Sequence, residues 1–173
     1  MERFTFLDIL RILSGILLIN AVLSYWITSS TTWGYDGKYI NPRYYWFQLG
    51  GQVNLTLAEL SHYDGTDNRP IYVAINGSVY DVTSARHIYG PKGPYRFFSG
   101  KDAARAFVTG CFNKPDEFTY DLRGLDPEEA RADVRKWQEF FGGNAKYWYV
   151  GVVQHEEITG DVPGECEHMK FPF

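Results

Sequence analysis

The segment from Ile88 to Gly100 is the part of this chain whose residue types most call for a chemical explanation. It reads IYGPKGPYRFFSG and combines two tyrosines, two phenylalanines and two Gly-Pro pairs. Proline and glycine interrupt helices and strands, so we expect an irregular loop held in one shape. A loop with this many rings either folds back over a core or forms the wall of a pocket for a flat apolar ligand.

The remaining residues that carry chemistry do not form a catalytic constellation. We find no nucleophile–base pair and no phosphate-binding loop, so the protein is not expected to be an enzyme.

The two cysteines, Cys111 and Cys166, lie outside any CxxC or Cys/His cluster, which argues against a zinc site. Two free thiols in a reducing compartment are the favoured interpretation, and a Cys111–Cys166 disulfide is the alternative if the domain is lumenal. The four histidines show no paired spacing: His62, His87, His155 and His168.

Length and composition narrow the class of protein. The chain has 173 residues, enough for one globular domain with attachments, and a formal net charge of −4. No basic face stands out, so nucleic acid is not an expected partner. Aromatic residues make up 17% of the chain, which suggests a belt at a membrane interface, a flat hydrophobic ligand, or both.

An uncharged apolar run over residues 12–28, ILSGILLINAVLSYWIT, indicates a membrane-spanning helix. With the apolar residues before it, this transmembrane helix is expected over about residues 7–28, close to the roughly 20 residues that cross a bilayer. Three aromatic residues stand where an interfacial belt belongs: Tyr25, Trp26 and Trp33. The chain is therefore expected to contact membrane lipid.

A cleaved signal peptide is the alternative for this run, since a charged start and an apolar middle also describe one. No small-x-small cleavage site follows the run, so we expect residues 1–28 to be a retained N-terminal transmembrane anchor. The flanking charges do not fix its orientation, because two basic residues lie on each side. These residues are Arg3 and Arg11 before the run, and Lys38 and Arg43 after it.

Residues 29–52 contain turn residues and scattered aromatic residues without a clear period. We interpret them as a juxtamembrane aromatic linker that lies on the membrane surface or against a partner. The run Tyr44-Tyr45-Trp46-Phe47 is too apolar for a free linker, so some surface should bury it.

Short helices and strands are expected in residues 53–155. The sequence TLAE at residues 56–59 is a capping box, which predicts a helix that starts there. Two strand-like runs, 71–75 and 78–82, are separated by Asn76-Gly77, the strongest two-residue hairpin signal.

Helical patterns dominate the second half of this segment. Residues 101–111 carry apolar residues at helical spacing. The sequence DPEE predicts a helix over residues 127–141, because it offers an aspartate cap, a proline in the first position and acids in the first turn. The core stripe of that helix is expected to be Ala130, Val134, Trp137 and Phe141. Residues 145–153 read as a final strand, and the acidic tail, residues 156–173, as loosely held.

Four stretches of the chain resemble a known family. LTLAELSHYDG, IYVAINGSVYDVT, YGPKGPYRFFSGKDAARAF and KYWYVG are similar, in this order, to the cytochrome b5-like haem/steroid-binding domain. The motif YGPxGPY followed by FxGxDAxR is the most specific part of the likeness, and the closer match is the membrane-associated progesterone receptor branch. The resemblance covers residues 53–154. It implies an α+β, cytochrome b5-like haem-binding domain behind an N-terminal transmembrane helix.

The resemblance also implies haem b bound by a tyrosine oxygen instead of two histidines, in agreement with the lack of an HPGG motif. By its position in the motif, Tyr95 becomes the iron ligand, while Tyr89 and the pair Lys146-Tyr147 line the pocket. His87 stands where the branch often has another basic residue, and imidazole also binds iron well, so His87 is the alternative ligand. Without the resemblance, Tyr89 and Tyr95 would be read as core residues and Lys146 as a surface charge.

The leading functional hypothesis from the resemblance is a single-pass membrane-anchored haem-binding protein. It would act in haem delivery or sensing, or as a partner of the sterol-metabolising haem-thiolate monooxygenases to which the family is linked. A single oxygen ligand leaves one haem face open for a partner, a sterol, or a second haem in a haem-mediated homodimer. The resemblance places the protein in the endoplasmic reticulum or another endomembrane, with the domain in the cytosol. The alternatives are a non-catalytic accessory subunit of a membrane protein complex, which uses the fold as an interaction module, and a sterol or lipid binder.

Two N-glycosylation patterns and one aspartate remain to be interpreted. Asn54-Leu55-Thr56 and Asn76-Gly77-Ser78 match the N-glycosylation pattern. Such matches are frequent, and Asn76 lies in a tight turn, so the sequence alone gives neither of them weight. Asp102 is expected to be an acid in the first turn of a helix, where it complements the helix dipole.

Overall fold

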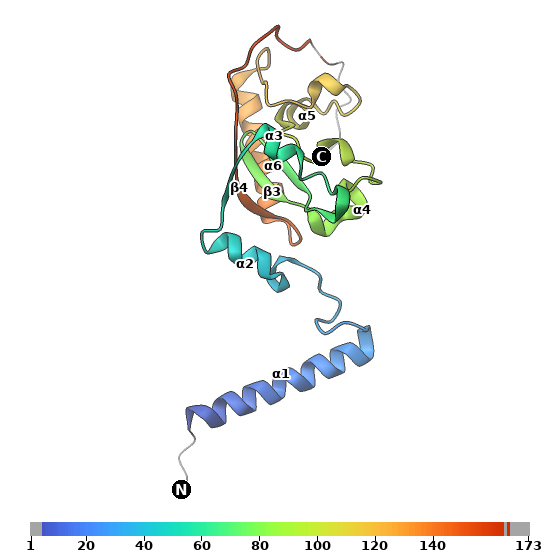
Figure 1. Ribbon diagram of the computed structural model, residues 1–173, viewed down its shortest axis with the longest axis vertical. Helices are drawn as coiled ribbons and strands as arrows, with labels where there is room; N and C mark the ends of the chain where they lie inside the picture. The colour runs from blue at the N-terminus through green and yellow to red at the C-terminus, as the bar shows by residue number, and fades with distance from the viewer. Residues whose placement is uncertain (1–4, 165, 167–173) are drawn as a thin grey trace. The chain divides into compact units, whose positions relative to one another are not determined.

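The computed structural model describes residues 5–164 and 166 of the chain. The chain divides into two compact units, one that ends at Asp36 and one that begins at Gly37. One long helix makes up most of the first unit, and the strands all lie in the second (Figure 1). The site residues predicted from the sequence belong to the second unit.

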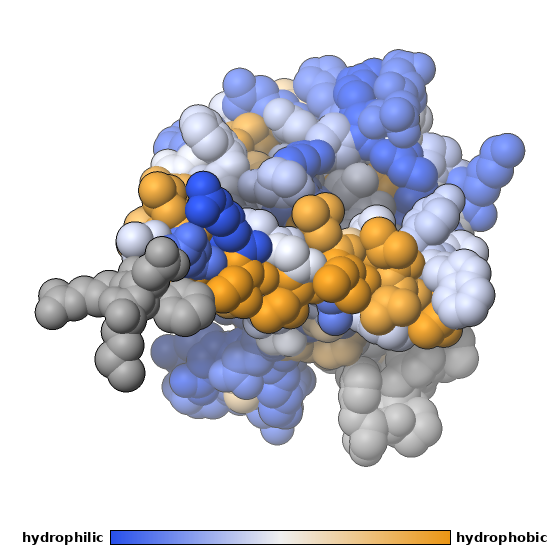
Figure 2. Space-filling model, turned by 90° about the horizontal axis from the view of Figure 1, so that it is seen from below, coloured by the Kyte–Doolittle hydropathy of each residue, from blue (hydrophilic) through white to orange (hydrophobic). Residues whose placement is uncertain are grey.

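Helix α1 (Phe6–Thr28) dominates the first unit. It starts with a capping box between Thr5 and Asp8, and it ends at Ser29, whose backbone is left-handed. The apolar side chains of the helix are exposed along its length and form a continuous orange band in Figure 2. The helix is long and apolar enough to cross a bilayer, which makes it a candidate membrane span.

The second unit combines short strands with short helices. The strands are β1 (Val53–Thr56), β2 (Tyr72–Ile75), β3 (Ser78–Asp81) and β4 (Trp148–Gln154). The α-helices are α2 (Pro42–Gln48), α3 (Leu57–Ser61), α4 (Arg86–Tyr89), α5 (Ala104–Thr109) and α6 (Pro127–Gly143). The 3-10 helices are Lys38–Ile40, Thr66–Asn68, Thr83–Ala85, Arg96–Phe98 and Pro115–Glu117.

One mixed sheet with the strand order β1-β4-β3-β2 forms the centre of this unit. β1 pairs with β4 in parallel, and the other two pairings are antiparallel. Asn76 and Gly77 join β2 to β3 with φ values of 48° and 88°, the positive values that a type I′ turn requires. The hairpin that the Asn-Gly pair predicts is therefore confirmed.

Apolar residues are buried on both faces of the sheet. One core cluster joins the sheet to α5 and α6 and includes Phe107, Phe141 and Tyr147. The other cluster includes Leu60 of α3 and Trp148 of β4. Consecutive residues of an extended chain point to opposite faces, which explains why Tyr147 and Trp148 belong to different clusters. Tyr147 thus comes to the same side of the sheet as α5 and α6.

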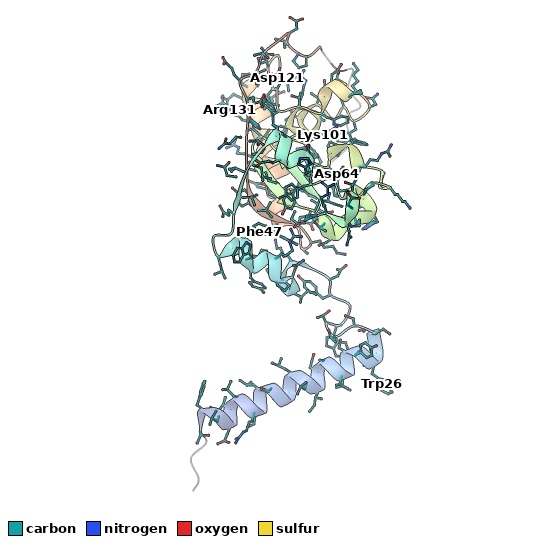
Figure 3. All side chains as sticks on the ribbon, viewed as in Figure 1. Trp26, Phe47, Asp64, Lys101, Asp121 and Arg131 are labelled. Atoms are coloured by element: carbon teal, nitrogen blue, oxygen red, sulfur yellow. A yellow bond between two sulfur atoms is a disulfide. The ribbon has the colours of Figure 1, made fainter. Side chains whose placement is uncertain are left out.

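Helix α2 and the residues just before it are packed onto the domain. Phe47 is only 6% exposed and points from α2 toward the sheet (Figure 3). Lys38 Nζ donates to a carbonyl near the end of α6 over 2.9 Å, and Arg43 forms a 3.2 Å ion pair with buried Asp81. The interpretation of this segment as a linker is therefore corrected, because from Gly37 onward it is part of the domain.

The segment after β4 is also tied to the domain. Arg105 Nη2 donates to the carbonyl of Pro163 over 3.3 Å. Cys111 and Cys166 are joined by a disulfide. In the part of the chain that the structure describes, the expectations of a loosely held tail and of two free thiols are therefore wrong, and the alternative of a disulfide is the one observed.

Helix α6 carries most of the predicted core stripe. Ala130, Val134 and Phe141 are buried. Trp137 is half-buried, and its indole N–H donates to the carbonyl of Phe107 over 2.8 Å.

Trp137→Ala is expected to lower the free energy of unfolding by about 2–3 kcal/mol, below the roughly 3–5 kcal/mol of a fully buried ring, because part of the indole already faces solvent. Chemical denaturation of the full chain in detergent micelles measures this loss. Phe140→Ala is the matched control, since Phe140 is 51% exposed on the same helix. An equal loss in both variants would contradict the orientation of α6 described above.

Candidate functional site

The loop between α4 and the 3-10 helix Arg96–Phe98 has a single, internally bonded shape. The Gly93 N–H donates to the carbonyl of Gly90 over 2.8 Å, and the Tyr95 N–H donates to the carbonyl of Ile88 over 2.9 Å. A Cβ atom on Gly93 would collide with the same Ile88 carbonyl, so this position requires glycine. The prediction of an irregular loop held in one shape is confirmed.

Tyr95 is the solvent-facing tyrosine of this loop. It is 39% exposed, and other aromatic rings surround it. Ring centroids within 6.3 Å of the Tyr95 ring belong to Tyr89, Phe97, Phe98 and Phe112. Phe98 is buried, so the loop folds into the core on one side and presents Tyr95 on the other. Phe112 comes from the segment after α5, and no local pattern in the sequence connected it to the loop.

Tyr89 and Tyr147 form a buried pair next to Tyr95. Their ring centroids are 6.0 Å apart in an edge-to-face arrangement, and both residues are buried. Burial strongly raises the pKa of the Tyr89 hydroxyl, and the neighbouring Tyr147 and Tyr95 raise it further. Burial also raises the pKa of Tyr147, against the opposing effect of the Lys146 charge. Tyr89 and Tyr147 are therefore neutral phenols at physiological pH, and Tyr95 is the member of the three whose ring is open to solvent.

Lys146 adjoins this group through Tyr147, and His87 is exposed on the helix that carries Tyr89. Lys146 is half-buried and directly precedes Tyr147, whose hydroxyl its charge influences. His87 is exposed on α4, two residues before the buried Tyr89. We call Tyr95, Tyr89, Lys146 and Tyr147 the tyrosine cluster.

The donors of the tyrosine cluster fit a haem that is held from one side. A phenol oxygen is a suitable ligand for ferric iron, because the charge of the ion favours the phenolate. The rings around Tyr95 offer apolar surface to a porphyrin, and Lys146 offers a cation to a propionate.

A surface cavity of about 380 Å³ has a lining that includes no residue of the tyrosine cluster. Its lining is Asn76, Leu122, Glu128, Arg131, Val134, Arg135 and Gln138. Arg131 and Glu128 form an exposed ion pair of 2.8 Å, and Gln138 donates to the carbonyl of Ile75. Arg131, Glu128 and Gln138 thus have structural partners, and we take the tyrosine cluster as the candidate functional site.

Asp102 has a role that the sequence did not reveal. Its side chain is fully buried, and its carboxylate accepts hydrogen bonds from the N–H groups of Asn76 at 2.9 Å and Gly77 at 2.7 Å. It also accepts from the N–H of Ala104 at 3.2 Å and contacts His155 Nε2 at 2.7 Å. The expectation of an acid in the first turn of a helix is therefore wrong, because α5 begins at Ala104 and Asp102 lies before its cap, where it fastens the β2–β3 turn to the start of α5.

Two buried tyrosines predict loss of stability in alkali. Burial raises the pKa of Tyr72 and of Tyr80 to about 12, from an ordinary value of 10.0. Between pH 10 and 12 the unfolded chain therefore loses phenol protons that the folded chain keeps, so stability is complete below pH 10 and falls as the pH rises. At about pH 11 we expect a loss on the order of 1 kcal/mol for each tyrosine. Denaturation of wild type and Tyr80→Phe at pH 9 and 11 checks this, because the variant should lose less.

The second unit is a small domain with a mixed sheet, short helices and a tyrosine cluster on one side of the sheet. A solved structure of a hypothetical protein from Arabidopsis thaliana, with a cytochrome b5-like fold, matches it with a TM-score of 0.53 and 39% identity, over 60% of this chain and 93% of that chain. The family model of the Cytochrome b5-like Heme/Steroid binding domain matches residues 56–153, and the chain belongs to this family.

Relatives of this chain define the branch within the family. Membrane steroid-binding protein 1 of Oryza sativa subsp. japonica is 46% identical over 97 residues, which cover 56% of this chain and 40% of that protein. Membrane-associated progesterone receptor component 2 of Homo sapiens is 42% identical over 101 residues, which cover 57% of this chain and 44% of that protein. The predicted fold class and branch are confirmed. The chain spans less than half the length of these two relatives.

Proposed function

We propose that this chain is a membrane-anchored haem-binding protein in which Tyr95 supplies the oxygen ligand of haem b. The observation that carries the proposal is the exposed phenol of Tyr95 on a rigid loop, surrounded by aromatic rings. The name of the family, which includes haem and steroid binding, supports it.

The buried neighbours of Tyr95 have supporting roles in this proposal. Tyr89 and Tyr147 remain neutral and keep the inner side of the cluster apolar. Lys146 neutralises either the phenolate of Tyr95 or a haem propionate. A bound haem would supply an iron centre that phenolate ligation holds in the ferric state. That preference suits haem delivery or sensing better than rapid electron transfer, so a reduced protein that keeps its haem and passes electrons quickly would contradict it.

The role is proposed to be non-catalytic. The names of the relatives refer to steroid binding or to a receptor component and not to a reaction. With a single ligand from Tyr95, the second face of the haem stays open to a sterol, to a partner or to the haem of a second copy in a homodimer.

Helix α1 is proposed to anchor the domain in an endomembrane such as the endoplasmic reticulum, and the names of the relatives support a membrane association. Haem-thiolate monooxygenases of sterol metabolism are the proposed partners if the domain lies in the cytosol with them. If the domain lies on the other side of the membrane, storage or delivery of haem there is the remaining role. The orientation therefore decides between these two roles.

The visible spectrum of the full chain tests the proposal. The protein is purified in mild detergent and titrated with haemin, and a saturable Soret band with a stoichiometry of about one is expected. Parallel titration with a sterol distinguishes a steroid binder, since a protein that binds sterol and shows no Soret band would contradict haem as the ligand. Competition between the two ligands would locate the sterol at the same site.

A second function is favoured by a specific surface. Around α2, Trp46 is 67% exposed and Leu49 is 87% exposed, although Phe47 between them is buried. Exposed apolar residues that lie together indicate a contact surface for a membrane or for another protein. An accessory subunit would use this surface to bind an integral membrane partner. A stoichiometric membrane partner that co-purifies in mild detergent, without Soret absorbance, would favour this function over haem binding.

A further inference from the structure

The disulfide is supported by the course of the chain around it. Cys111 follows α5 and is buried, and the Cα atoms of Cys111 and Cys166 are 6.4 Å apart, within the range of disulfides in proteins. The bridge spans a sequence separation of 55 residues. It therefore fixes the segment after β4 to the start of the loop that follows α5.

Hydrogen bonds bring the two cysteines together independently of the bridge. The hydroxyl of Tyr120 donates to the carbonyl of Glu156 over 3.1 Å. Arg123 Nη2 donates to the carbonyls of Gly160 and Asp161, both at 3.3 Å. With the Arg105 contact described above, these bonds hold the segment after β4 alongside the 105–124 segment, so the pairing of the cysteines follows from the fold.

A structural disulfide indicates the compartment of the domain. Such bridges persist in oxidising surroundings and are rare in the cytosol, where thiols are kept reduced. Both cysteines of the chain take part in the bridge. The cytosolic orientation expected from the resemblance does not account for this pairing.

The basic residues after α1 do not oppose translocation of the domain. Lys38 and Arg43 balance the two basic residues before the apolar run 12–28, but both make contacts in the folded domain. Charges near a span act on orientation mainly through short loops, whereas whole domains are translocated largely regardless of charge. The charge balance is therefore compatible with an N-terminus in the cytosol and a domain on the opposite side.

An acceptor sequence for N-glycosylation lies on an exposed edge of this domain. Asn54 is in β1, an edge strand of the sheet, and its side chain is exposed while that of Leu55 is buried. Thr56 completes the Asn-x-Thr pattern. The second match begins at Asn76, in the β2–β3 turn, where the backbone N–H is bound to Asp102 and φ is 48°. Of the two asparagines, Asn54 is therefore the one that we expect to be glycosylated.

We propose that the domain faces an oxidising compartment, the lumen of an endomembrane or the cell exterior, and that Asn54 carries an N-linked glycan there. The proposal rests on the disulfide and on the exposed acceptor, and it does not depend on haem binding.

Two covalent steps are needed, transfer of an oligosaccharide to Asn54 and oxidation of the two cysteines. The amide nitrogen of Asn54 forms a bond to the anomeric carbon of an oligosaccharide carried on a lipid diphosphate. The bond from that carbon to the diphosphate oxygen breaks, the lipid diphosphate leaves, and the nitrogen loses one proton. The disulfide forms when the two cysteine thiols lose two protons and two electrons to a disulfide-bearing oxidant, which becomes a dithiol.

Glycosidase treatment of the full chain, expressed in eukaryotic cells, tests the glycan. Wild type and the matched control N76Q should both gain mobility on a gel after treatment with a peptide N-glycosidase, and N54Q should not. Thr56→Ser keeps the acceptor pattern and should behave as wild type. A glycan that persists in N54Q and is lost in N76Q overturns the choice of Asn54, and an unglycosylated wild type overturns the modification.

The orientation is read separately in sealed microsomes from the same cells. The domain should resist added protease until detergent opens the vesicles, and Cys111 and Cys166 should react with an alkylating reagent only after reduction. Digestion of the domain in intact vesicles, together with thiols that react without reduction, overturns the proposed orientation. A domain in the wrong compartment can still bind haemin after purification, so this result is distinguishable from failure of the haem-binding proposal.

Discussion

Replacing Tyr95 by phenylalanine is expected to weaken haemin binding by at least on the order of 100-fold while the domain stays folded. Loss of a group that only supports a metal ligand typically costs about 10- to 100-fold in affinity, and loss of the ligand itself should cost no less. Tyr95→Phe removes one oxygen and keeps the ring, so the ring contacts with Phe97 and Phe112 remain. Haemin titration followed at the Soret band measures the affinity, and thermal unfolding of the unliganded protein measures the fold.

The size of this effect follows from the chemistry of a phenol next to a cation. A free phenol has a pKa of about 10 and is a poor ligand while protonated. A ferric ion favours the phenolate, as bound cations do for other acidic ligands. Tyr95 is the tyrosine of the motif whose ring is open to solvent, whereas burial raises the pKa of Tyr89 and holds it neutral. The two tyrosines are therefore expected to differ in role although they lie in one motif.

Three control variants separate ligation from other causes. Tyr89→Phe should weaken binding less than Tyr95→Phe, because its oxygen supports the cluster without reaching the iron. Tyr39→Phe should leave binding unchanged, since Tyr39 is exposed in the segment before α2. His87→Ala tests the alternative ligand. If Tyr95→Phe binds haemin with an unchanged spectrum and His87→Ala does not bind it, the ligand is His87 and the proposed role of Tyr95 is wrong.

The parts of the fold that the sequence predicts well are those with local signals. Asn76-Gly77 predicts its own turn, because the positive φ values of a type I′ turn suit asparagine and glycine. Asp126 and the proline after it predict the start of α6, and the Asp126 side chain does accept from the N–H groups of Glu128 and Glu129. The glycines and prolines of the segment 88–100 likewise predict its irregular shape.

The parts that the sequence does not predict depend on contacts between distant residues. Lys38 Nζ and the carbonyl of Gly142 meet although 104 positions separate them, and no local pattern indicates such a pair. The same holds for the disulfide and for Phe112 beside Tyr95. The tyrosines of the tyrosine cluster can therefore be predicted from their motif. The burial of each ring, the rings that contact it, and the disulfide to the segment after β4 follow from the three-dimensional packing.

Arg105→Met is expected to lower the free energy of unfolding by about 3–5 kcal/mol, because it leaves the carboxylate of Glu117 buried without its cation. The side chains of Arg105 and Glu117 are 2% and 3% exposed, and Arg105 Nε lies 3.2 Å from Glu117 Oε1. Arg105 Nη1 also donates to the carbonyls of Asp121 and Arg123 at 3.1 and 2.9 Å, so the variant removes partners from the whole loop after α5. Chemical denaturation of the full chain in detergent measures the loss.

An exposed ion pair on α6 provides the matched control. Arg131 and Glu128 are 2.8 Å apart but 67% and 85% exposed, so Arg131→Met should cost no more than about 1 kcal/mol. The double variant Arg105→Met with Glu117→Gln should recover part of the loss, because the amide no longer buries a charge and can still accept from the Thr109 hydroxyl. Equal losses for Arg105→Met and Arg131→Met would show that solvent reaches the Arg105–Glu117 pair. In that case the loop after α5 is not the closed, charge-stabilised structure that carries the disulfide.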